Sequence, residues 1–239
     1  MPYTHSGLFI PCYINALYPE VGVATWHLLK DLGVKPVCPA GQTCCGQPMA
    51  NAGFERGAIP LLEEFKKRFD SFEYVITPSA SCAVFLREHL GRTGHRVYEL
   101  CEFLLDVLKI TGVPGRFCHK VSIHNSCHGV RKLHLSSASE LVEPPYSKLR
   151  KILSLVEGIE ICEPANTDEC CGFGGMFSIE EPSVSVCMGQ DKLKNHLDTG
   201  AQYITGADSS CLMHLQGIAQ REEAPIRFIH IAQILAAGL

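Results

Sequence analysis

The chain alternates between short apolar runs and longer stretches in which apolar residues recur every three or four positions. Short runs are typical of buried strands, and the three-to-four spacing is typical of helices that bury one face. The strand-like runs lie in 8–16, 34–40, 74–82, 121–130, 159–165 and 203–211, and the helical stripes lie in 21–33, 59–69, 147–158 and 184–200. This alternation predicts an α/β fold in which helices flank mostly parallel sheets.

The second half of the chain repeats the order of elements found in the first half. Each half reads strand, helix, strand, cysteine pair, helix and strand, and a glycine- and proline-rich segment at 111–116 separates the halves. We therefore predict two tandem, pseudo-repeated domains, 1–114 and 115–239, each with a small, mostly parallel sheet. The final segment, 226–239, has apolar residues at helical spacing, and we expect a helix in the core or at a subunit contact.

Eight of the thirteen cysteines follow the same repeat. In each half one cysteine follows the first strand, two adjacent cysteines lie in the middle, and a fourth follows the last strand. The first set is Cys12, Cys44, Cys45 and Cys82, and the second set is Cys127, Cys170, Cys171 and Cys211. Ligands of parallel sheets bind at the carboxyl ends of the strands, so we expect each set to meet at one edge of its sheet.

A glycine follows each adjacent cysteine pair, at Gly46 and at Gly172. Side chains alternate along a regular strand, so two neighbouring cysteines face one site only where the chain turns sharply. Glycine permits such a turn, and it lets backbone N–H groups approach sulfur, which tunes the potential of a cluster. We therefore expect both cysteines of each pair to face the same site.

Four thiolates hold either zinc or an iron–sulfur cluster. Structural zinc usually uses short knuckles of two cysteines, and neither half contains a C-x-x-C. Ligands from distant strand ends favour a cofactor added to a stable scaffold, and we expect iron–sulfur clusters of the [4Fe–4S] type. Zinc at one of the sites and a redox-active dithiol at the adjacent pair remain alternatives.

Composition and charge argue against some classes of protein. The net charge of -4 offers no basic surface for nucleic acid. Charged residues make up 19%, below the typical value, which indicates a surface covered by a partner. No apolar run is long enough for a transmembrane helix, and the start lacks the pattern of a signal peptide, so we expect a cytoplasmic protein. The remaining cysteines fit small buried hydrophobes: Cys38, Cys101, Cys118, Cys162 and Cys187.

Several segments together carry a family resemblance. They are CCGQPMANAG (44–53), SASC (79–82), SCHGVR (126–131), ECCGFGGMFS (169–178) and GADSSCLMHL (206–215). In this order they resemble the CCG-domain (cysteine-rich domain) family, which includes the cysteine-rich subunit of heterodisulfide reductase, the iron–sulfur subunit of glycolate oxidase and, above all, the lactate utilization protein A family. The resemblance covers essentially the whole chain.

The resemblance implies an electron-transfer subunit in a multi-component system that oxidises L-lactate to pyruvate. Its implied partners are a ferredoxin-like iron–sulfur protein of the lactate utilization protein B type, a third lactate utilization protein, and a small 2-hydroxy acid as substrate of the complex. It implies that the eight repeated cysteines hold the iron–sulfur clusters. No GxGxxG fingerprint or flavin motif is present, so we expect the lactate chemistry on a partner.

The sequence departs from the heterodisulfide reductase pattern at the end of each half. That family has a C-x-x-C there, which gives a fifth thiolate, whereas this chain has Phe85 and His214 at the second position. Phe85 has no donor atom, and His214 is a further candidate ligand. A five-cysteine cluster and heterodisulfide-type disulfide reduction are therefore weaker alternatives than a four-cysteine cluster.

Basic residues surround Cys127 in HNSCHGVR. His128 and Arg131 are candidate catalytic residues, because an arginine binds a carboxylate through two hydrogen bonds. The competing interpretation is a capped loop that leads into a helix with solvent-exposed basic groups, and we favour it for His124. After the first cysteine pair, we expect the polar group of Gln47 to bond to backbone.

Overall fold

A computed structural model describes residues 5–142 and 144–238. The start of the predicted domain 1–114 and the last residue of the segment 226–239 thus lie outside the described residues. The first half contains β1 (Ser6–Leu8), α1 (Cys12–Leu17), α2 (Pro19–Asp31), β2 (Pro36–Val37), α3 (Gln47–Asn51), α4 (Glu55–Phe69), β3 (Tyr74–Thr77), α5 (Ala80–His89), β4 (Val97–Glu99) and α6 (Leu100–Glu102). Short helical turns follow at Gly94–Arg96, before β4, and at Phe103–Val107, after α6.

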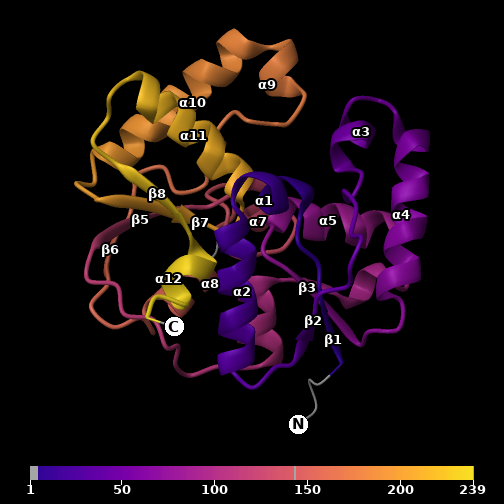
Figure 1. Cartoon of the computed structure of the whole chain (residues 1–239). Helices are drawn as coiled ribbons and strands as arrows, with labels where there is room; N and C mark the ends of the chain where they lie inside the picture. The colour runs from indigo at the N-terminus through magenta and orange to yellow at the C-terminus, as the bar shows by residue number, and fades with distance from the viewer. Residues whose placement is uncertain (1–4, 143, 239) are drawn as a thin grey trace.

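The second half repeats this order (Figure 1). It contains β5 (Lys120–His124), α7 (Cys127–Arg131), α8 (Lys148–Leu153), β6 (Glu160–Cys162), α9 (Phe177–Glu180), α10 (Pro182–Leu197), β7 (Tyr203–Gly206), α11 (Ser209–Arg221), β8 (Arg227–His230) and α12 (Ile231–Leu235). The tandem α/β organisation expected from the sequence is confirmed.

Each half builds one four-stranded parallel sheet. The strand orders are β2-β1-β3-β4 and β6-β5-β7-β8, and every described pair within them is parallel. In each sheet the first strand lies between the second and the third, so the chain leaves neighbouring strands in opposite directions. This topological switch point is where parallel α/β sheets bind their ligands, at the carboxyl ends of the strands.

The helices follow from local sequence signals. Pro19 begins α2, where its missing N–H costs nothing, and Gly33 follows the helix with a positive φ of 80°. In α4 the buried face carries Ala58, Phe65 and Phe69, whereas its last turn holds three basic residues that suit the negative end of the helix dipole.

The fourth strand of each sheet was not predicted. The segment 226–239 was expected to be one helix, and this is wrong: it forms the strand β8 followed by the short helix α12. The segment begins as a strand because Arg227–His230 pairs in register with the neighbouring strand β7. His230 then begins α12 as its N-cap, where its side chain accepts a hydrogen bond from the backbone N–H of Ala232.

The two halves share one hydrophobic core. A single cluster of buried apolar residues includes Leu28 and Phe103 from the first half and Ile152 and Ile234 from the second. Figure 1 shows the C-terminal helix α12 alongside α2, and these two helices are in contact. Within the described residues no helix has the length and apolarity needed to cross a membrane.

Candidate metal sites

The first cysteine set meets at the switch point of the first sheet. Cys12 begins α1 after strand β1, and Cys82 lies in the first turn of α5 after β3. The sulfur atoms of Cys45 and Cys82 lie 3.5 Å apart, and Cys44 is hydrogen-bonded to both Cys12 and Cys45. The four thiols thus form one continuous chain of contacts.

The second set meets at the switch point of the other sheet in the same way. Cys127 begins α7 after β5, and Cys211 lies in the first turn of α11 after β7. The sulfur atoms of Cys127 and Cys170 are 3.7 Å apart, and Cys171 is hydrogen-bonded to Cys170 and Cys211. The structure therefore brings together all eight cysteines of the sequence pattern, in two sets of four.

Helix N-termini point at both sites. In each half, the two outer cysteines occupy the first turn of a helix that directly follows a strand. The unpaired N–H groups and the positive end of the helix dipole favour negative charge, so they stabilise a thiolate. Ser79 and Ser126 cap two of these helices by accepting N–H bonds from Cys82 and Gly129.

The thiols of each site lie so close together that the charge on one disfavours ionisation of the others. Hydrogen bonds from Cys12 and Cys45 lower the pKa of Cys44, and the bond to Cys44 with burial raises the pKa of Cys12. The second site repeats this pattern, with the pKa of Cys170 lowered by Cys127 and Cys171. Without a cation, these directions favour a thiolate at Cys44 and at Cys170, beside thiols whose pKa is raised at Cys12 and Cys127.

This donor set fits a metal centre. A bound metal replaces thiol protons and neutralises the repulsion between the thiolates. Four cysteine sulfurs, partly shielded from water and backed by helix N-termini, are the donor set that zinc and iron–sulfur clusters use. A metal group at the first site would be held by Cys12, Cys44, Cys45 and Cys82, and one at the second by Cys127, Cys170, Cys171 and Cys211.

The family model for the CCG cysteine-rich domain matches the chain twice, at residues 6–87 and 121–216. This chain belongs to the CCG cysteine-rich domain family. Each match contains one of the two four-cysteine sets, so the internal repeat and the family match describe the same two units.

Curated relatives match nearly the whole chain. Lactate utilization protein A of Exiguobacterium sp. (strain ATCC BAA-1283 / AT1b) is 36% identical, covering 97% of this chain and 97% of its own. Lactate utilization protein A of Geobacillus kaustophilus is 36% identical over 96% of this chain and 98% of its own. The family resemblance seen in the sequence is confirmed.

Among solved structures, a putative Asp/Glu racemase from Yersinia pestis aligns over 98% of this chain and 96% of its own. The identity is 13% and the TM-score is 0.39. A likeness at this level carries no inference about function.

The glycine of each CCG triplet makes the turn that the sequence predicted. Gly46 has φ 102° and Gly172 has φ 86°, values that side chains disfavour. Each glycine directs its N–H at the sulfur two residues earlier: both Gly46 N–Cys44 Sγ and Gly172 N–Cys170 Sγ are 3.4 Å. Glycine is therefore favoured at this turn by its positive φ, and the turn aims the backbone N–H at the thiolate.

We expect Gly172→Ala to destabilise the CCG fold by at least about 1 kcal/mol, because of its positive φ and a clash. An added Cβ would lie 2.5 Å from the carbonyl oxygen of Ser185. Gly175→Ala is the matched control, since Gly175 also has a positive φ but open space around its Cβ position. Urea unfolding of both variants measures the difference, and equal losses would contradict the role of the close approach.

The two candidate catalytic residues already have partners. The guanidinium of Arg131 lies 3.2 Å from Glu140 and 3.5 Å from Asp168. His128 Nε2 lies 3.3 Å from the amide nitrogen of Gln47, so this pair joins the first CCG loop to the second unit. Gln47 thus contacts a side chain of the other half. A substrate carboxylate would have to displace two acids from Arg131.

An open cleft of about 650 Å³ leads to the second site. Cys127 and Cys170 line it together with Arg131, Asp168 and Glu169. Asp168 is paired with Arg131, so Glu169 leaves this mouth with a net negative charge, which disfavours a small anion because like charges repel.

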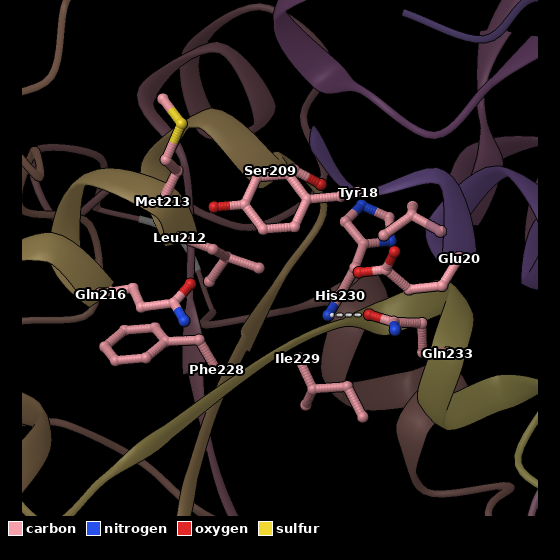
Figure 2. A pocket seen from close by; sticks show the side chains of 11 residues that line it. Tyr18, Glu20, Ser209, Leu212, Met213, Gln216, Phe228, Ile229, His230 and Gln233 are labelled. Carbon is pink, nitrogen blue, oxygen red and sulfur yellow. Dashed lines mark hydrogen bonds between the residues drawn. The ribbon is translucent and has the colours of Figure 1, made fainter. Parts of the chain in front are cut away.

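Figure 2 shows a second cavity, of about 150 Å³, where α2 meets α11, β8 and α12. Tyr18 and Glu20 line it from the first half, and Ser209, Gln216 and His230 line it from the second. Glu20 is the single acidic side chain among the described lining residues, and no lysine or arginine balances it. A carboxylate ligand is therefore disfavoured here as well.

His214, the predicted extra ligand, makes contacts with other parts of the protein. Its Nε2 lies 3.3 Å from the carbonyl oxygen and 3.4 Å from the hydroxyl of Ser185, and its ring lies beside Phe173. At the corresponding place in the first half, Phe85 is buried and stacks on His89 at 4.1 Å. Both positions are accounted for by protein contacts.

The cysteines outside the two sites differ in exposure. Cys101 is fully buried, as a small hydrophobe should be, and Cys162 is half-buried. The interpretation as buried hydrophobes is wrong for the exposed thiols Cys38, Cys118 and Cys187. Cys38 instead accepts a hydrogen bond from the amide of Gln42.

His124 is a candidate site residue that the sequence analysis did not select. It was expected to be solvent-exposed, but its side chain is 1% exposed. One of its ring nitrogens and the sulfurs of Cys171 and Cys211 all lie within 4.8 Å of one another. Burial, and to a lesser degree Lys192, lowers the pKa of His124 to about 3, so the imidazole is neutral. The one available signal was its place at the end of a strand, three residues before Cys127.

Proposed function

We propose that this CCG protein is the iron–sulfur electron-transfer subunit of a multi-component system that oxidises L-lactate to pyruvate. The observation that carries the proposal is the pair of four-thiol sites at the two switch points, repeated with the same order of contacts. The name of the curated relatives supports lactate as the substrate of the whole system.

In this proposal the eight cysteines hold [4Fe–4S] clusters, which supply one-electron transfer when bound. The chain's own residues shape that function. The CCG glycines direct N–H groups at Cys44 and Cys170, and the helix N-termini offset the negative charge of the thiolates. The acidic cleft beside Cys127 and Cys170 keeps small anions away and leaves that edge open to a partner.

We place the oxidation of lactate itself on a partner. The sequence contains no dinucleotide fingerprint, and the cleft at the second site is lined by acids rather than by free basic groups. The proposed partners are a ferredoxin-like iron–sulfur protein of the lactate utilization protein B type and a third lactate utilization protein, acting together in the cytoplasm. A 2-hydroxy acid then binds to the complex rather than to this chain alone.

One observation favours a second candidate, a zinc-stabilised scaffold subunit. The sulfur separations of 3.5 Å and 3.7 Å resemble the edges of a tetrahedron around a single ion. Zinc–sulfur bonds of about 2.3 Å place neighbouring sulfurs about 3.8 Å apart. A four-iron cluster carries each thiolate on its own iron, so the thiols would have to move apart to accept it.

Metal analysis separates the two candidates. Iron, zinc and acid-labile sulfide are measured per chain in protein produced and purified without oxygen, with EPR after reduction by dithionite. The proposal expects about four irons and four sulfides per occupied site. Zinc without sulfide would support the scaffold, and absence of any metal would leave the thiols as the redox groups.

Electron transfer is tested with a double variant. We expect Cys170→Ser/Cys171→Ser to abolish lactate-dependent reduction of an acceptor when the chain is mixed with its purified partner proteins, because half of the second site's sulfurs are lost. Cys187→Ser is the matched control, since Cys187 is exposed and belongs to neither set. Full activity in the double variant would overturn the proposal.

A further inference from the structure

Different side chains pack beneath the two cysteine sets. The register of the two sheets shows which residues of the two halves are equivalent. Tyr74 and Tyr203 begin equivalent strands, and they pair with Ser6 and Val121 respectively. Counting onward, Phe9 in the first half is therefore equivalent to His124 in the second. Both residues come three positions before the first cysteine of their set.

In the first half the support beneath the cysteines is aromatic. Phe9 packs edge-on against Phe65 and Phe69, with ring centroids 5.2 Å and 5.8 Å away. The two partners are four residues apart in the last turns of α4 and lie on one face of it. Gly7 leaves room for them, because an added Cβ would lie 2.9 Å from the ring of Phe69.

In the second half the equivalent positions carry polar side chains. The ring of His124 lies edge-on to His196, with centroids 5.9 Å apart, as Phe9 lies to Phe69. Lys192 comes one helical turn before His196 on α10 and is fully buried. Ser122 replaces Gly7, and its hydroxyl lies 2.8 Å from Nδ1 of His196. Three apolar positions have thus become a buried group of two histidines and a lysine.

Burying these groups is costly unless each has a partner. Lys192 has one, since its Nζ donates to the carbonyl oxygen of Asn166 at 2.5 Å, and His196 is held by Ser122. His124 does not, because neither of its ring nitrogens has a hydrogen-bond partner within the described part of the chain. One of its ring nitrogens instead lies within 4.8 Å of the sulfurs of Cys171 and Cys211. A neutral imidazole in this position is a common metal ligand.

We propose that His124 is a nitrogen ligand of the metal group at the second site, beside Cys171 and Cys211, whereas the first site is held by thiolates alone. The inference rests on the proposed metal-binding function of the two sites. It explains why a buried histidine with unpaired ring nitrogens stands where the first half has Phe9.

Two neighbours support His124 in this role. Metal-bound histidines usually donate their second ring N–H to a nearby acceptor, and the neighbouring ring of His196 carries an Nε2 that has no hydrogen-bond partner within the described residues. The buried ammonium of Lys192 interacts favourably with Cys170 and Cys171 and so offsets the negative charge of a metal–thiolate group. The first half has no such cation at the equivalent position, Phe65.

The test uses the full chain with its first site disabled by Cys44→Ser/Cys45→Ser, so that only the second site takes metal. The protein is loaded without oxygen, either with iron and sulfide and then reduced, or with cobalt(II) as a paramagnetic substitute for zinc. Pulsed EPR on samples with natural and ¹⁵N-labelled histidine then detects nitrogen bound to the metal. We expect a strong coupling that changes with the label, and this readout needs no change at His124 and so no assumption about the folding of a His124 variant.

Variants assign that coupling to one residue. We expect His124→Phe, which copies the first half, to lose the coupling and to release metal to a chelator at least about tenfold faster. His214→Phe is the matched control and should keep both properties. Should His124→Phe misfold, His124→Gln serves as the smaller change.

The outcomes distinguish the two proposals. A loaded second site without histidine coupling, or a coupling that survives in His124→Phe, would overturn the role of His124 and leave metal binding standing. Failure of the unmodified chain to load any metal would overturn the proposed function, and the role of His124 with it.

Discussion

Replacing Glu99 by glutamine is expected to raise the free energy of unfolding at pH 8 by about 3 to 5 kcal/mol and to leave it nearly unchanged at pH 4. Glu99 ends β4 and is fully buried, and one of its carboxylate oxygens has no hydrogen-bond partner within the described residues. Burial, with the nearby charge of Glu102, raises its pKa from 4.5 to about 8.

The direction with pH follows from proton binding. Between pH 4.5 and pH 8 the folded protein binds a proton at Glu99 that the unfolded chain releases, so stability is lost as the pH rises through this window. Glutamine keeps the oxygen that accepts the N–H groups of Cys101 and Glu102 but cannot ionise. Urea unfolding of both proteins across this pH window measures the difference. Titration of the thiols contributes equally in both proteins, so it does not affect the difference between them.

Glu88→Gln serves as the control for this prediction. Glu88 is exposed and partnered by Lys132, so its replacement should show no gain that grows with pH. A gain in Glu99→Gln that is the same at pH 4 and pH 8 would contradict a buried, titrating carboxyl group.

The second large effect is expected at Asp208, which joins the two halves. Its carboxylate is 2% exposed and accepts hydrogen bonds from Tyr13 Oη at 2.9 Å and from the backbone N–H of Ser81 at 2.8 Å. Ser210 Oγ donates a third at 3.0 Å. We expect Asp208→Ala to lower the free energy of unfolding by about 3 kcal/mol or more, because several buried donors lose a charged acceptor at once.

The same change should disturb both metal sites. Tyr13 follows Cys12, Ser81 precedes Cys82, and Asp208 lies three residues before Cys211, so one carboxylate positions helices of both sets. We expect Asp208→Ala to reduce the metal bound per chain at both sites. Asp198→Ala, at an exposed position, is the control. Loss of metal from the second site alone would show that the contact across the halves has no such role.

Periodicity and cysteine spacing predicted most of the fold and the sulfur part of both sites. The strands before Cys12, Cys82, Cys127 and Cys211 were visible because each apolar run ends at a cysteine, and parallel sheets bring strand ends together. The turn at Gly172 was also predictable, because adjacent cysteines cannot face one site without it.

The remainder depends on contacts that leave no local pattern. The strands β4 and β8 are short, and only their pairing with β3 and β7 distinguishes them from helical segments. The role of His124 depends on burial, which one histidine in a polar-looking stretch does not reveal. The bridge from Asp208 to Tyr13 joins residues 195 positions apart.

The place of α12 has a consequence for how the chain is made. This helix is the last described element before the C-terminus, yet it packs on α2, and its residues Ile234 and Leu235 are fully buried in the shared core. While the ribosome is still adding the second half, α2 therefore lacks one of its packing partners. We therefore expect folding of the first half to be completed only when residues 231–235 have left the exit tunnel, and a chain that stops before residue 231 to leave the shared core open.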